Sequence, residues 1–240
     1  MKFMVLAKRN FKEVWLDRIS LFMAIVLPVV LLLIMVPVGR LNPFFTATIL
    51  APGIVLFGFA MLTFSSGMIL ARDRECALFS RLLTAPLGAN EFLSAYSLPY
   101  IPVAIIQIAV IYAIGGLLGL EISGNAGLVF LILFIMSIGY IGLGMILGSL
   151  FTSKQLPLVW VAVEILTIFG GAWMPLEDIG GALQSAMYAL PFAHAIDAAR
   201  DVMVYGVGFS DIATDFYWVI GFTLVFFTLG IFLFRRRMVE

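Results

Sequence analysis

The chain has 240 residues, of which 63% are hydrophobic and 12% are charged. This composition excludes a soluble globular domain. Fourteen Lys and Arg balance fourteen Asp and Glu, so the net charge provides no general attraction to nucleic acid, and we expect none as a partner. The single cysteine, Cys76, excludes a disulfide framework and a thiol cluster for a metal.

Six apolar runs are close to or longer than the roughly 20 residues that a helix needs to cross the hydrocarbon of a bilayer. They cover residues 20–38, 47–70, 98–120, 126–150, 156–173 and 212–234. The sequence therefore predicts an all-α polytopic membrane protein with six transmembrane helices. Residues 1–240 are expected to form a single transmembrane domain in the lipid bilayer.

Twelve of the fourteen basic residues lie in alternate gaps between these runs. They are Lys2, Lys8, Arg9, Lys12, Arg18, Arg72, Arg74, Arg81, Lys154, Arg235, Arg236 and Arg237. The other gaps contain only Arg40 and Arg200, together with several acidic residues. Positive charge stays on the cytoplasmic side during insertion. We therefore expect a multi-pass protein of the cytoplasmic (inner) membrane, with both termini in the cytoplasm.

The first segment, residues 1–19, has the pattern of an amphipathic helix. Its apolar residues recur at helical spacing, and they are Phe3, Leu6, Ala7, Phe11, Val14 and Trp15. A basic helix with aromatic residues on its apolar face lies flat in the headgroup region. It could act only as an anchor, or it could also contact a cytoplasmic partner. No small-x-small cleavage site follows the apolar run, so we expect the first span to be retained.

The loop after the second run, residues 72–90, is predicted to contain a short cytoplasmic helix. Asp73 and Glu75 in its opening turn favour a helix start, and Pro86 ends it. Between them is an apolar stripe of Leu78, Phe79, Leu82 and Leu83. Such a helix could rest on the membrane surface or fit into a socket on a soluble partner.

The segment between the fifth and sixth runs, residues 174–211, is too polar and broken to cross the membrane. Gly180 and Gly181 precede one helical stretch, Pro191 interrupts it, and a second stretch covers residues 193–204. Two short helices dipping into the outer leaflet fit this pattern best. Irregular backbone at that depth must be covered by protein or face water. An extracytoplasmic re-entrant helical hairpin is therefore predicted.

Glu164 is an acidic residue well inside a predicted span. A carboxylate there costs about 2.5–3.5 kcal/mol on insertion scales, so it should face protein or water. Trp160, Thr167 and Gly171 share its helix face, and a similar stripe on the second run comprises Phe57, Met61, Phe64 and Met68. These residues could surround a bulky amphipathic substrate, with Met and Phe as an adaptable wall. Alternatively, the stripe faces lipid and Glu164 holds a structural hydrogen bond, for example to Gln107.

Several short motifs add a resemblance. They are Arg72-Asp73-Arg74-Glu75 and Leu82-Leu83-Thr84-Ala85-Pro86 after span two, Met174-Pro175-Leu176-Glu177 after span five, the Leu190-Pro191 break and the Ala199-Arg200 pair. With the six-span layout, they resemble the permease subunit of type-2 ABC exporters, a family that includes drug, polysaccharide and lipid transporters. The chain departs at Cys76-Ala77, where the family commonly has a Gly-Thr-like pair.

The resemblance implies a complex of two permeases, identical or homologous, and two ABC ATPase subunits. In the family, spans two and five line a cavity at the permease dimer interface. The loop at 72–90 would be the coupling helix, and the residues meeting the ATPase would be Glu75, Leu78, Phe79, Leu82 and Leu83. A hydrophobic or amphipathic drug, lipid or glycan-lipid would be the exported compound. The chain has no G-x-x-x-x-G-K-[ST] phosphate loop, so ATP and Mg²⁺ are expected on the partner, with no cofactor and no enzymatic activity in this chain.

Three other functional classes of membrane protein are alternatives to a permease. An intramembrane Ser–His protease would need His194, the single histidine, and a serine in a G-x-S-G context, yet Ser65 follows Phe64. A secondary transporter would show several intramembrane charges or symmetric broken helices, and no internal repeat is evident. A non-transporting membrane scaffold or lipid scramblase stays an alternative.

Overall fold

The computed structural model describes residues 2–38, 45–76 and 88–238, and all regular structure in these ranges is helical. Five stretches there are long and apolar enough to span a membrane, namely Arg18–Val38, Ala47–Glu75, Ala89–Leu117, Ala126–Leu150 and Ala213–Arg236. The predicted all-α membrane fold is confirmed. The predicted fifth span appears as the shorter apolar helix Leu156–Ala172, so length and composition do not confirm the count of six.

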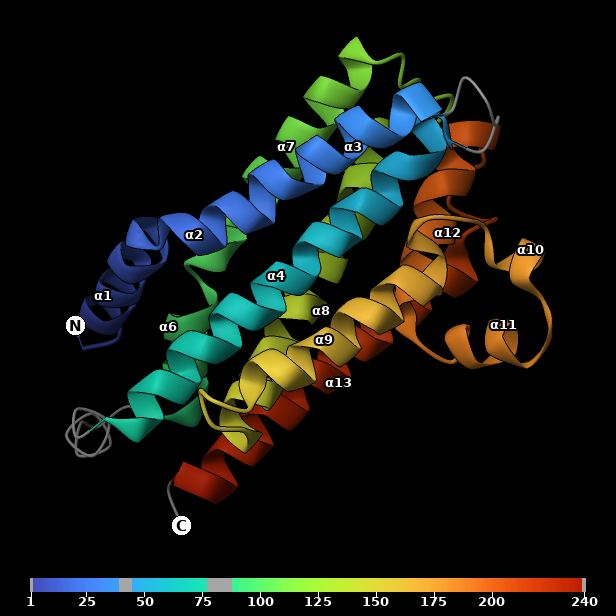
Figure 1. Cartoon of the computed structure of the whole chain (residues 1–240). Helices are drawn as coiled ribbons and strands as arrows, with labels where there is room; N and C mark the ends of the chain where they lie inside the picture. The colour runs from blue at the N-terminus through green and yellow to red at the C-terminus, as the bar shows by residue number, and fades with distance from the viewer. Residues whose placement is uncertain (1, 39–44, 77–87, 239–240) are drawn as a thin grey trace.

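The chain begins with helix α1 (Lys2–Leu16), which meets the first apolar stretch at a bend. That stretch consists of α2 (Arg18–Leu21), the π-helical turn η1 (Phe22–Val26) and α3 (Leu27–Val38). Asp17 lies at the bend, and its Oδ1 accepts a hydrogen bond from the Ser20 amide at 3.1 Å. A carboxylate at this position satisfies a free amide of the first turn, so it marks the start of a new helix. The chain changes direction between α1 and α2 (Figure 1).

The predicted apolar face of α1 is buried against the protein at some positions and exposed at others. Leu6, Ala7 and Val14 are buried, whereas Phe11 and Trp15 are 42% and 38% exposed. The buried side packs against α6 (Ala89–Ser97), a separate helix before the third span. A turn at Leu98 and Pro99 separates α6 from α7 (Tyr100–Leu117). The predicted span at 98–120 therefore corresponds to α7, and α6, the contact surface of α1, was not predicted.

Helices α4 (Ala47–Glu75) and α8 (Ala126–Leu150) form the centre of the bundle. Small residues let them approach closely. A Cβ added at Gly144 would lie 2.0 Å from Ser66 Oγ, and one at Gly148 would lie 2.5 Å from Gly67 O. Thr63 Oγ1 also donates to the Tyr140 carbonyl oxygen at 2.7 Å. The Gly-x-x-x-Gly pair of α8 is thus a helix-packing site.

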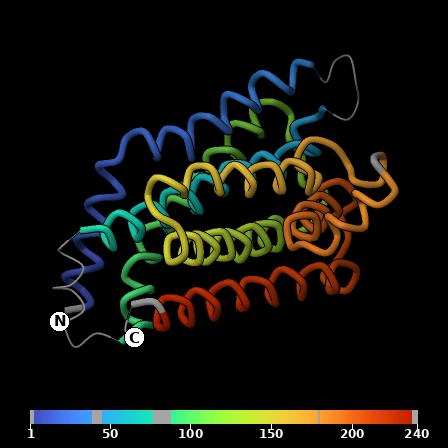
Figure 2. The backbone as a smooth tube through the Cα atoms, turned by 60° about the horizontal axis from the view of Figure 1, so that its bottom comes forward, coloured from blue at the N-terminus to red at the C-terminus, as the bar shows by residue number. Residues whose placement is uncertain are grey.

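The other long helices surround this pair (Figures 1 and 2). α3 and α7 pack on α4, α13 (Ala213–Met238) packs on α8, and α9 (Leu156–Thr167), with its π-helical end η3 (Ile168–Ala172), also packs on α4. Both chain termini lie at one end of the bundle (Figure 1). α4 continues without a break to Glu75. Residues 72–75 therefore end the second span, and the prediction that a separate coupling helix starts at Arg72 is wrong.

At the opposite end, the chain between α9 and α13 forms three short helices, α10 (Leu176–Ile179), α11 (Gly181–Met187) and α12 (Pro191–Tyr205). η3 turns at Gly171, whose φ is 98°, a conformation that favours glycine. α12 starts at Pro191, which suits the first position of a helix. Most of α12 is buried against α4, α8 and α13, whereas most residues of α11 are exposed.

Candidate functional site

The face between α4 and α9 brings most of the predicted pathway residues together. Phe57, Met61 and Phe64 lie half-buried along one side of α4. The rings of Phe64 and Trp160 have their centroids 5.2 Å apart, and Trp160 Nε1 donates to the Ala60 carbonyl oxygen at 2.8 Å. The two stripes that the periodicity indicated on separate helices therefore contact each other through Phe64 and Trp160.

A second aromatic pair lies on the same face, nearer η3. Phe57 meets Trp173 edge-on, with centroids 5.8 Å apart. Trp173 was not among the predicted residues, because it follows the kink at Gly171 and helical periodicity stops there. Its Nε1 is buried and has no hydrogen-bond partner within the described ranges. The two aromatic pairs are about 10 Å apart along α4, since Phe57 and Phe64 are seven residues apart at 1.5 Å each.

Thr167 belongs to a different contact. Its side chain is fully buried, and its Oγ1 donates to the Val163 carbonyl oxygen at 2.9 Å. Thr167 Oγ1 also lies 2.7 Å from the Tyr140 hydroxyl of α8. The structure thus places Thr167 between α9 and α8, away from the half-buried face that Trp160 helps to form.

Glu164 is half-buried, and its Oε2 is buried without a hydrogen-bond partner among the described residues. None of the ion pairs found in that part of the chain includes it. The predicted alternative, a bond to Gln107, is wrong. Gln107 Nε2 instead donates to the Val55 carbonyl oxygen at 3.0 Å and lies beside Pro28 and Gly58, on the side of α4 that faces α3.

Glu75, the described member of the predicted ATPase-coupling set, ends α4 at the α1 end of the bundle. Glu75 accepts hydrogen bonds from the Ser153 amide at 2.7 Å and the Ser153 hydroxyl at 2.6 Å. These bonds fasten the end of α4 to the turn between α8 and α9. The remaining members of the set, Leu78, Phe79, Leu82 and Leu83, lie outside the described residues.

Asp73 connects three helices at this end, a role that sequence reasoning missed. Its side chain is buried, with the residue 5% exposed, and it accepts hydrogen bonds from the Arg9 guanidinium of α1 and the Tyr96 hydroxyl of α6. Beside it, Asn10 Nδ2 donates to the Ala95 carbonyl oxygen at 3.1 Å. A buried carboxylate needs such partners. The sequence signal was the polar Asn10 on the apolar side of α1.

The end of the bundle that contains α10, α11 and α12 has a second polar network, centred on His194. Its Nδ1 lies 2.6 Å from Asp215 Oδ1, its Nε2 lies 2.9 Å from the Tyr188 carbonyl oxygen, and its ring stacks on Trp218 at 4.9 Å. Both ring nitrogens are therefore engaged in fastening α12 to its neighbours. The hydroxyls of Ser65 and Ser66 bond to main-chain oxygens of their own helix, so these contacts do not form a Ser–His dyad.

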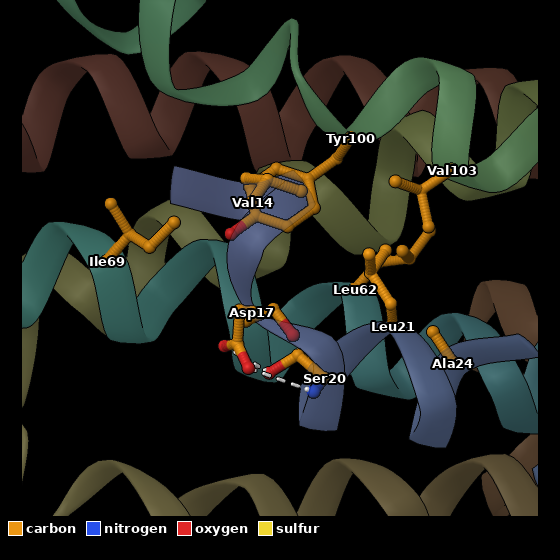
Figure 3. A pocket seen from close by; sticks show the side chains of 10 residues that line it. Val14, Asp17, Ser20, Leu21, Ala24, Leu62, Ile69, Tyr100 and Val103 are labelled. Atoms are coloured by element: carbon orange, nitrogen blue, oxygen red, sulfur yellow. Dashed lines mark hydrogen bonds between the residues drawn. The ribbon is translucent and has the colours of Figure 1, made fainter. Parts of the chain in front are cut away.

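A small pocket lies at the bend between α1 and the first apolar stretch (Figure 3). Its volume is about 10 Å³, about enough for one water molecule. Asp17, Ser20 and Tyr100 are among its lining residues, and the buried Tyr100 hydroxyl has no partner among the described residues. None of the predicted pathway residues lines it, so it is separate from the α4–α9 face.

Comparisons with known proteins agree with the all-helical membrane fold described above. A family model described as "ABC-2 type transporter" matches residues 1–204. The chain is similar to "Inner membrane transport permease YhhJ" of Escherichia coli (strain K12), with 25% identity over 177 residues, covering 72% of this chain and 47% of that protein. It is also similar to "Probable multidrug ABC transporter permease YbhR" of the same organism, with 23% identity over 156 residues, 64% of this chain and 41% of that protein. The chain thus spans about half the length of the curated relatives it matches.

Proposed function

The chain belongs to the ABC-2 type transporter family, and we propose that it is the membrane-spanning permease of an ATP-driven exporter. Separate ABC ATPase subunits would bind ATP and Mg²⁺, and this chain would hold no cofactor and catalyse no reaction itself. The names of its relatives, a transport permease and a probable multidrug ABC transporter permease, support a transport role in the inner membrane.

The distribution of charge in space supports a cytoplasmic location for both termini. Helix α1, the ends of α4 and α13 and the turn between α8 and α9 lie at the end of the bundle where both termini lie, whereas α10 and α11 lie at the other (Figure 1). The first group of elements contains Arg9, Arg74, Arg235 and Lys154, and α10 contains Glu177. By the positive-inside rule, the first end faces the cytoplasm.

The helix Leu156–Ala172 would then be the fifth of six spans. At 1.5 Å per residue it covers about 25 Å, close to the hydrocarbon thickness of about 30 Å. It packs along α4 and connects the turn with Lys154 to the outer helices. Five spans alone would leave the two termini on opposite sides, against the charge pattern.

The observation that carries the proposal is the anchoring of both flanks of the segment 77–87. Before it, Glu75 is bonded to Ser153. Asp73 of α4 precedes the segment and Tyr96 of α6 follows it. The Tyr96 hydroxyl donates a hydrogen bond to Asp73, which also accepts one from Arg9. A soluble partner that binds segment 77–87, which lies outside the described residues, would therefore act on α1 and α4 through these contacts. We assign segment 77–87 as the coupling segment that meets the ATPase.

In the proposed mechanism, two permeases, either two copies of this chain or this chain and a homologue, place their α4–α9 faces around a shared pathway. ATP binding closes the two ATPases, which displaces the coupling segments. α4 moves with them because its end is fastened to the segment's flanks. The pathway then opens outward and releases a hydrophobic or amphipathic compound.

The test is recovery of an ATPase with the tagged chain. The wild-type chain, purified from its own cells, should bring an ABC ATPase identified by mass spectrometry and by vanadate-sensitive ATP hydrolysis. Replacing Leu78 and Leu82 with Asp should remove it, because burying one leucine contributes about 1.5–3 kcal/mol. Leu183→Asp, at an exposed position on α11 at the opposite end, serves as the control and should retain it.

Two outcomes contradict the proposal. If the wild-type chain brings no ATPase, a secondary transporter or a non-transporting scaffold or scramblase explains the fold better. If the double variant retains the ATPase at full stoichiometry, the coupling role of the segment is wrong.

A further inference from the structure

The α4–α9 face contains an unpaired acid and two pairs of aromatic rings. Glu164 follows Trp160 by one helical turn and precedes the kink that leads to Trp173, so along the chain it lies between the two tryptophans that meet Phe64 and Phe57. Its Oε2 is buried with no hydrogen-bond partner in the part of the chain that the structure describes.

The only formal charge on the stretches of α4 and α9 that form this face is negative. Residues 47–71 of α4 contain no charged side chain, and Glu164 is the sole charged residue in Leu156–Ala172. A desolvated carboxylate is costly unless a positive charge or hydrogen-bond donors compensate it. These stretches of α4 and α9 supply no cation, so a cation that enters the face would compensate the carboxylate.

The surrounding side chains determine which kind of cation fits. The faces of Trp and Phe rings carry negative charge density and attract cations within about 6 Å of the ring centroid. Met61, one turn from Phe57 and Phe64, adds a flexible apolar wall. A metal ion would need several oxygen, nitrogen or sulfur ligands, and the described residues contain no group of three or more His, Cys, Asp or Glu able to hold one.

We infer that the α4–α9 face binds a hydrophobic organic cation, with Glu164 as the charge-selecting residue and the aromatic pairs as its walls. The inference rests on the proposed function, in which this face lines the substrate pathway and a second permease completes it. An apolar anion of the same size would meet the same rings but would be repelled by the carboxylate.

Two probes separate charge from shape, because tetraphenylphosphonium and tetraphenylborate have nearly the same size and opposite charges. Their equilibrium binding is measured on the purified complex in one detergent, without ATP. The wild-type protein is expected to bind the phosphonium. Glu164→Gln should weaken that binding about tenfold or more and leave the borate unchanged or tighter. Each ion partitions equally into the same detergent for every variant, so the comparison between proteins removes that contribution.

Two further variants complete the design. Glu121→Gln removes an exposed carboxylate outside this face and should change neither affinity. Glu164→Asp retains the charge and should keep the preference for the phosphonium, which also covers the case in which Glu164→Gln fails to fold. The inference is overturned if the wild-type protein and Glu164→Gln bind the phosphonium equally, or if Glu164→Asp loses the preference. Neither result affects the recovery of the ATPase, which tests the proposed function separately.

Discussion

Arg200 of α12 donates a hydrogen bond from Nη2 to the Gly171 carbonyl oxygen at 3.0 Å, where the apolar helix α9–η3 ends. The same side chain donates from Nε to the Ile49 carbonyl oxygen, in the first turn of α4, at 3.2 Å. Arg200 is 7% exposed. A single buried guanidinium thus fastens the outer ends of the two helices that form the α4–α9 face.

Arg200→Lys is expected to destabilise the protein, because a single ammonium group cannot reproduce the planar fork that serves both carbonyl oxygens. Losing one charged hydrogen bond costs about 1.5–3 kcal/mol, which should lower the melting temperature measured by tryptophan fluorescence in detergent. Arg18→Lys, at an exposed position, should melt like the wild type. Equal melting of both variants would show that Arg200 does not hold the two helices.

The stability of the outer end should depend on pH through His194. Burial alone would lower the pKa of His194, but the Asp215 carboxylate and the Tyr188 carbonyl oxygen outweigh it, so the pKa is raised. Burial raises the pKa of Asp197 as well. The folded state therefore holds protons more tightly than the unfolded chain, and the resulting stability is lost as pH rises through the folded pKa of His194.

The measurement compares the wild type with His194→Gln. The wild type should melt higher than the variant at about pH 6, and the difference should shrink towards about pH 8, where an ordinary histidine, with a pKa near 6.5, is neutral. Asp197 titrates in both proteins, so it largely cancels in the difference. A gap that stays constant or widens with pH would contradict the assigned protonated His194–Asp215 pair.

A double-mutant cycle tests the three-helix contact at Asp73. We expect Arg9→Gln and Asp73→Asn to be coupled by about 1–3 kcal/mol, because neighbouring charges in one buried network are not additive. The Arg9–Glu13 ion pair on α1 provides the internal control, since its side chains are 35% and 37% exposed. Glu13→Gln should be coupled to Arg9→Gln by no more than about 0.5 kcal/mol. Similar coupling in the two cycles would exclude a special role for Asp73.

Cysteine labelling tests the membrane orientation. Cys76 is exposed, so it is first replaced by Ser. New cysteines are then placed at Thr84, in the proposed coupling segment, and at Ala182, exposed on α11. An impermeant maleimide should label position 182 from outside, and position 84 only after permeabilisation. Labelling at position 84 from outside would overturn the six-span topology.

The sequence predicted individual elements well where the signal is local. The apolar run at 126–150 coincides with α8, whose start is marked by Asn125, with Oδ1 accepting bonds from the Gly127 and Leu128 amides. Elements that depend on a neighbour were missed. α6 is a short helix that packs against the buried side of α1, and it lies before the predicted third span, where no helix was predicted.

The candidate site was predicted in part for the same reason. Helical spacing places Phe57 and Phe64 on one side of α4, and Trp160 indeed meets Phe64. Spacing alone could not tell that Thr167 turns towards Tyr140 of α8, or that Gln107 bonds to Val55. α4 is apolar on all sides, so its sequence does not indicate which side faces which neighbour.

The sequence by itself determined the membrane class of the protein, the positions of its apolar helices and the asymmetry of its charges, because hydrophobic length and charge are properties of consecutive residues. Only the tertiary structure decided the polar contacts between helices. Asp73 meets Arg9 across 64 positions, and Arg200 meets Ile49 across 151. These contacts depend on how each helix is rotated in the bundle, and that rotation is set by close packing among many apolar side chains rather than by any one segment.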